Sequence, residues 1–137
     1  MTAAQDLADM ATITQARYEQ RQQAFAMLVA EENRLRAEIK RLDAMRHDAD
    51  AADGQAIELR AIGADVIWQG WLGRAKTALN LDLARVLAVK EHHMQEVRRA
   101  YGKVLVINEM KEQLRREVKK SVVDNELSQA IALSIFG

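Results

Sequence analysis

The chain has 137 residues, of which 49% are hydrophobic, 4% aromatic and 29% charged, and it contains neither proline nor cysteine. Its 20 Lys and Arg residues balance its 20 Asp and Glu residues, which argues against a dedicated nucleic-acid binder with the usual basic excess. The lack of cysteine excludes disulfides and cysteine-ligated zinc. Few aromatic side chains leave little material for a thick core. Together these features predict an all-α protein of long helices, forming one domain over residues 1–137.

The first predicted helix spans residues 3–47 and carries a seven-residue hydrophobic repeat. Its two stripes alternate at spacings of three and four residues, which is the a/d pattern of a coiled-coil seam. The stripes are Ala4, Ala11, Tyr18, Phe25, Glu32, Ile39 and Arg46, and Leu7, Thr14, Arg21, Leu28, Leu35, Leu42 and Ala49. At 1.5 Å per residue this helix is about 68 Å long.

The repeat fails over residues 48–55, where Asp48, Asp50 and Asp53 precede Gly54. Asp and Gly favour turns, and glycine relieves the steric cost of a positive φ. This segment is therefore predicted to be the bend of a hairpin.

The second predicted helix spans residues 56–122, about 100 Å, and an apolar helical tail follows at residues 124–136. Its stripes are Leu72, Leu79, Val86, His93, Ala100, Ile107, Leu114 and Ser121, and Leu83, Lys90, Val97, Val104, Lys111 and Val118. The two segments predict an antiparallel two-helix coiled-coil hairpin with unequal arms, the second being longer.

The unequal lengths lead to the main functional prediction. With a bend near residue 52, Ala4 lies opposite Ala100, and the second helix has no partner inside the hairpin beyond that point. The apolar stripe nevertheless continues, and a bare stripe of this kind is normally covered by another molecule. The predicted partner-binding residues on it are Val104, Ile107, Leu114 and Val118.

The same register predicts the core beside the bend. The first helix contributes Leu28, Leu35, Ile39 and Leu42 to this core. The residues expected opposite them are Leu59, Ile62, Val66 and Trp68.

Two further features admit two interpretations each. Trp68 and Trp71 either pack on the first helix or form part of a binding surface, since Trp is enriched in interface hot spots; we include both among the partner-binding residues. Residues 85–120 carry ten bases and five acids, a local charge of +5. That segment is either an ordinary solvated face or a surface for an acidic partner.

No enzyme site, cofactor or metal is expected. The segment 70–77 resembles a phosphate-binding loop only faintly, because no glycine precedes Lys76. His92 with Glu96 offers two metal ligands, too few for a structural zinc site. Residues 1–10 lack the pattern of a secretion signal and no stretch is apolar enough to span a membrane, so a cytoplasmic protein is expected.

The chain resembles the small coiled-coil proteins of type III export systems, the flagellar FliJ and virulence YscO group. The resemblance lies in length, absence of proline and cysteine, heptad arms and a near-central bend, and in residues 84–110 with the run KEHHMQEVRRAYGKVLVINEM. It implies a stalk that inserts into a hexameric export ATPase ring and contacts the membrane export gate or chaperones. The alternatives are a self-associating coiled-coil adaptor, as a homodimer, and a helical chaperone or regulator unrelated to secretion.

Overall fold

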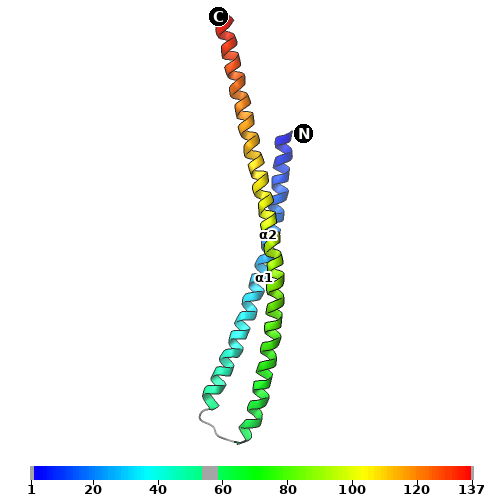
Figure 1. Cartoon of the computed structure of the whole chain (residues 1–137), viewed down its shortest axis with the longest axis vertical. Helices are drawn as coiled ribbons and strands as arrows, with labels where there is room; N and C mark the ends of the chain where they lie inside the picture. The colour runs from blue at the N-terminus through cyan, green and yellow to red at the C-terminus, as the bar shows by residue number, and fades with distance from the viewer. Residues whose placement is uncertain (1, 54–58, 137) are drawn as a thin grey trace. The chain divides into compact units, whose positions relative to one another are not determined.

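The computed structural model describes residues 2–53 and 59–136, with side chains described for all of these except 52, 53 and 59–62. It contains two α-helices, α1 (Ala3–Asp53) and α2 (Leu59–Phe136), and no strand in the part described. The helices run antiparallel and pack against each other, so the fold is a helical hairpin whose second helix is longer (Figure 1). No described helix is long and apolar enough to cross a membrane.

Thr2 caps the start of α1. The Thr2 Oγ1 accepts a hydrogen bond from the Gln5 backbone N–H at 3.2 Å, and the Thr2 carbonyl accepts one from the Asp6 N–H at 3.1 Å. The Asp6 carboxylate in the first turn faces the positive end of the helix dipole.

The end of α1 corrects the predicted bend. The helix continues through residues 48–53, which were expected to be non-helical. Three alanines within this segment are the best helix formers, and each Asp costs only a few tenths of a kcal/mol. The Gln69 Nε2 also donates a hydrogen bond to the Asp50 Oδ1 at 3.3 Å, which links this last part of α1 to α2. The rest of the predicted bend, residues 54 and 55, and the predicted start of the second helix at residue 56 lie outside the described residues.

The helix α2 shows no interruption. It continues through Gly63–Gly73, and also through the boundary expected between residues 122 and 124. The tail predicted at 124–136 is therefore the end of α2.

The chain divides into two compact units, Gln23–Gln95 and a second unit of Met1–Gln22 with Glu96–Gly137. In the Gln23–Gln95 unit, the seam is built around the buried side chains of Leu35, Leu42 and Leu72. Two interhelical ion pairs flank it: Lys90 Nζ lies 2.6 Å from Glu32 Oε1, and Lys76 Nζ lies 2.7 Å from Asp43 Oδ1. The Lys90 ammonium also lies 5.9 Å from the centre of the Phe25 ring, within the range of a cation–π contact.

The register in this unit differs from the predicted one. Leu42 lines a groove together with Trp71, Ala75 and Leu79, and Ile39 lines another with Leu83. The expected neighbours do not form the core: Val66 and Trp68 are exposed, and the side chains of Leu59 and Ile62 lie outside the described residues. The sequence analysis predicted the bend too early in the chain. In a hairpin, moving the bend by one residue changes by two residues which position of the second helix lies opposite a given position of the first.

The second unit, which contains the first part of α1, has a narrower seam. Val104 and Ile107 are its buried side chains, at 7% and 6% exposure. The rings of Tyr18 and Tyr101 lie 5.3 Å apart across the helix pair. The Arg21 Nη1 lies 2.6 Å from the Glu96 Oε2.

Candidate binding surfaces

The prediction that Val104 and Ile107 form a bare stripe was wrong. Both side chains are buried, and Leu114 is half-buried. The later bend brings the beginning of α1 alongside them: Ala8 and Ala11 border the same surface groove as Asn108 and Lys111. These positions of the stripe are therefore internal core.

The uncovered part of α2 begins one residue after Leu114. Every residue from 115 to 136 is exposed, and α2 continues here past the start of α1 within their unit (Figure 1). Val118, at 56% exposure, is the one predicted partner-binding residue on this segment. The large apolar side chains exposed on it are Val118, Val122, Val123, Leu127, Ile131, Leu133, Ile135 and Phe136. We call residues 115–136 the α2 end.

The apolar residues of the α2 end do not simply continue the hairpin seam. At 3.6 residues per turn, Val104, Ile107 and Leu114 all point within roughly 40° of Val118. Leu127 is nine residues beyond Val118 and lies on about the opposite side of the helix, with Val123 and Ile131 close to it. Phe136 returns to the side of Val118. The α2 end is thus apolar on two faces, both exposed, whereas the buried side chains of the preceding part, Val104 and Ile107, lie on one face.

Charge is concentrated before the apolar residues of the α2 end. Glu112 accepts hydrogen bonds from the Arg115 guanidinium, at 2.7 Å for the shorter one, and lies 3.6 Å from Arg116. The hydrogen bond from Arg115 lowers the pKa of Glu112. Lys119, Lys120, Asp124 and Glu126 follow, and no charged side chain occurs beyond Glu126 in the sequence.

Trp68 and Trp71 form a stacked pair. Their ring centres are 5.2 Å apart with an interplanar angle of 15°. Trp71 borders the groove that contains Leu42, yet it remains 47% exposed, and Trp68 is 37% exposed. Packing inside the hairpin therefore covers only part of this pair, which leaves an aromatic surface on α2.

The glycines beside the tryptophans are not required by contacts within the hairpin. A Cβ added at Gly63 or Gly73 would meet nothing within 4 Å. At Gly70 it would meet only the Arg74 Nη1, the end of a flexible side chain, at 3.3 Å. α2 is continuous through all three glycines.

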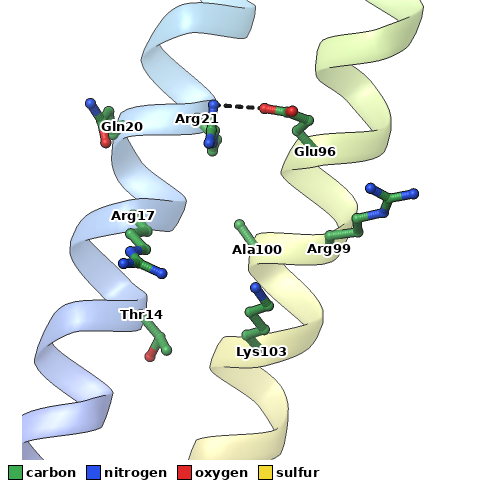
Figure 2. A pocket seen from close by; sticks show the side chains of 8 residues that line it. All are labelled: Thr14, Arg17, Gln20, Arg21, Glu96, Arg99, Ala100 and Lys103. Carbon is green, nitrogen blue, oxygen red and sulfur yellow. Dashed lines mark ion pairs between the residues drawn. The ribbon is translucent and has the colours of Figure 1, made fainter.

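A groove of about 510 Å³ lies between the helices in the unit that contains Val104 and Ile107. Four basic side chains and one acidic side chain line it (Figure 2). The lining residues are Thr14, Arg17, Gln20, Arg21, Glu96, Arg99, Ala100 and Lys103. The sequence analysis did not identify this site, although two signals were present: the i,i+4 pairs Arg17 with Arg21 and Arg99 with Lys103.

The side chains of His93 and Ser134 contact backbone carbonyl groups of their own helix. The His93 Nδ1 lies 3.0 Å from the Val89 carbonyl oxygen, and Ser134 Oγ donates a hydrogen bond to the Ile131 carbonyl at 2.8 Å. Among the described residues, no group of three His, Cys, Asp or Glu side chains is placed to hold a metal ion. The pKa changes come from ion pairs and hydrogen bonds at the surface, as where Arg34 lowers the pKa of Glu31.

Comparisons of the chain with protein-family models, with curated proteins and with solved structures give no match.

Proposed function

We propose that the chain is a non-enzymatic, protein-binding helical hairpin, and that it serves as a stalk or adaptor of a flagellar or type III protein export apparatus. In this proposal the α2 end is held by a hexameric export ATPase ring. The part of the hairpin where α1 and α2 pair supports this segment and holds it away from the rest of the chain.

The observation that carries the proposal is the apolar character of the α2 end on two opposite faces. A helix with one neighbour buries a single apolar stripe, and the buried side chains of the covered part of α2 in this unit, Val104 and Ile107, lie on one face. A helix that is apolar on several sides is buried by several neighbours. A partner that encloses the α2 end covers both Val118 and Leu127, whereas a single helix packed on one side covers only one of them.

The resemblance to the FliJ and YscO group supplies the identity of the enclosing partner. The subunits of a ring surround a central helix, and this arrangement suits an apolar segment with more than one apolar face. An antiparallel two-helix coiled coil is also the fold that the resemblance implies.

The test uses the purified chain and the hexameric export ATPase from the same source, mixed and separated by size-exclusion chromatography. The intact chain is expected to co-elute with the ring. Val118→Asp with Val122→Asp changes one face of the α2 end, and Leu127→Asp with Ile131→Asp changes the other. Each double variant is expected to lose co-elution while keeping its helix content by circular dichroism, because all four side chains are exposed.

The matched control is Met27→Asp with Val66→Asp, which places two charges at exposed apolar positions of the Gln23–Gln95 unit. This variant should co-elute as the intact chain does. Absence of co-elution for the intact chain contradicts the stalk assignment. Loss in only one of the two α2-end variants contradicts an enclosing partner and favours a partner that packs on one side.

Self-association is the second candidate, and one observation favours it. Val123, Leu127, Ile131 and Ile135 follow one another at spacings of four residues, which makes a ridge that a second copy could pack against. Multi-angle light scattering of the pure chain distinguishes the two. A stable dimer that Leu127→Asp with Ile131→Asp converts to a monomer supports the adaptor, and a monomer supports the stalk.

A further inference from the structure

We propose that the groove lined by Arg17, Arg21, Arg99 and Lys103 binds an acidic segment of a partner protein through its carboxylates. The inference deepens the proposed function by naming the chemistry of a second binding surface, and it rests on the chain being a protein-binding hairpin. The groove and the α2 end use different residues, so the two surfaces can be tested separately.

The first step of the argument is the charge within the groove. The Arg21 Nη1 lies 2.6 Å from the Glu96 Oε2, so Glu96, the acidic residue of the lining, already has a cationic partner. No carboxylate of the described residues forms an ion pair with Arg17, Arg99 or Lys103. Arg17, Arg99 and Lys103 therefore line the groove without a carboxylate partner among the described residues. The Arg99 side chain extends away from α1, so Arg17 and Lys103 carry the charge between the helices (Figure 2).

The second step is the shape of the site. Thr14 and Ala100 occupy the seam here, and these small side chains leave space between the helices where leucines fill it in the other unit. Figure 2 shows Arg17 on α1 and Lys103 on α2 reaching toward this space, with the Arg21–Glu96 pair at one end. The groove volume of about 510 Å³ falls in the range of small-ligand sites, roughly 300–1,000 Å³.

The third step is the choice of anion. The planar guanidinium of arginine binds a carboxylate with two parallel hydrogen bonds, and the ammonium of lysine adds a mobile positive charge. A nucleic acid would need a longer basic track, because a duplex carries one charge per about 1.7 Å of its axis. The site is a short patch on a chain with zero net charge, which favours a few carboxylates on a peptide.

The test is fluorescence anisotropy with a fluorescein-labelled oligoglutamate peptide at low ionic strength. The intact chain is expected to bind the peptide, and added salt should weaken binding because the groove is open to solvent. Arg17→Glu with Lys103→Glu is expected to raise the Kd by about tenfold or more, which equals about 1.4 kcal/mol. Arg17→Gln with Lys103→Gln should give a smaller increase with less risk to folding, which circular dichroism checks.

The matched control is Lys40→Glu with Arg46→Glu, which makes the same change in net charge at exposed positions of the other unit. It should bind the peptide nearly as the intact chain does. Equal losses of peptide affinity in both charge-reversed variants would show unspecific electrostatic attraction and overturn the proposal. Absence of peptide binding by the intact chain would also overturn it. Tighter binding of a single-stranded oligonucleotide of equal charge, lost in the groove variant, would overturn the choice of an acidic peptide.

The α2-end variant Leu127→Asp with Ile131→Asp separates this inference from the proposed function. It should keep peptide binding and lose the ATPase ring. If the groove variant binds peptide normally while the α2-end variant loses the ring, the groove proposal fails and the proposed function stands.

Discussion

The covered and uncovered parts of α2 differ within one helix and one compact unit. In the covered part, Val104 and Ile107 are buried beside α1, while Leu105 and Val106 between them are exposed. In the α2 end, no side chain is covered and the apolar residues occupy two faces. Under the proposed function, the exposed apolar faces of the α2 end are the ones that a partner outside the chain covers.

The largest change in stability is expected when a charge is placed in the covered part of α2, and the same change in the α2 end serves for comparison. Ile107→Asp puts a carboxylate into a covered position, where it loses hydration. We expect it to lower the free energy of unfolding by about 3 kcal/mol or more. Val118→Asp makes the same kind of change at a position that is 56% exposed, and should alter stability by less than about 0.5 kcal/mol.

Urea unfolding followed by circular dichroism measures both variants. Equal stability of the Ile107→Asp and Val118→Asp proteins would mean that α1 does not cover Ile107 in solution. The stripe would then be open along its whole length, as the sequence analysis had expected.

The sequence predicted the faces of the helices better than their register. The heptad positions Leu35, Leu42, Leu72, Val104 and Ile107 are the buried side chains of the described residues, and all lie on the predicted stripes. Periodicity identifies such faces because each helix repeats its own pattern. The sequence does not state which residue of one helix meets which residue of the other, since that depends on where the bend lies.

The bend was misplaced because local preference was given too much weight. Asp48, Asp50 and Asp53 favour turns individually, but each disfavours a helix only slightly, and the helix already formed before them continues. The prediction of a bare stripe at Val104 and Ile107 followed from that misplacement. Val118 remained exposed because α1 begins at Ala3 and is too short to reach it.

The basic groove was missed for a different reason. A heptad pattern marks Thr14 and Ala100 only as weak seam positions. It does not predict the space that two small residues leave between the helices when they lie in the same part of the seam. Only the correct register brings Arg17 and Lys103 to the same groove. A search for paired basic residues on both predicted helices would have identified the components of the site but not their association.

A smaller change in stability is expected when alanine replaces a glycine at an uncovered position of α2. Gly73→Ala should raise the free energy of unfolding by about 0.5–1 kcal/mol, since alanine loses less backbone entropy in a helix and its methyl group meets nothing within 4 Å. Gly70→Ala is the matched control, because its methyl group must displace the Arg74 guanidinium from 3.3 Å, and its gain should be smaller. Thermal unfolding monitored by circular dichroism compares them. A destabilised Gly73→Ala protein would indicate a covering contact at this face.

The smallest change in stability is expected from removing the charge of Glu32, in the covered part of the Gln23–Gln95 unit. The Glu32 side chain is 12% exposed and receives hydrogen bonds from Lys90 at 2.6 Å and Arg36 at 2.8 Å. The bond from Lys90, followed by that from Arg36, lowers the pKa of Glu32 below its ordinary value of 4.5. A carboxylate with a depressed pKa in the folded state stabilises the fold above its unfolded pKa, and this contribution is lost as the pH falls through the folded pKa.

Glu32→Gln removes this titration while keeping the shape of the side chain. We expect the intact chain to be more stable than the variant at neutral pH, and the difference to shrink as the pH falls from about 4.5 through the lower folded pKa. Urea unfolding at a series of pH values measures it. The control is Glu117→Gln on the α2 end, which should show no such difference at any pH, because no cation of the described residues pairs with Glu117. The prediction is contradicted if the difference in free energy of unfolding between the intact chain and Glu32→Gln is the same at every pH. The contacts of Lys90 and Arg36 with this side chain would then not depend on its negative charge.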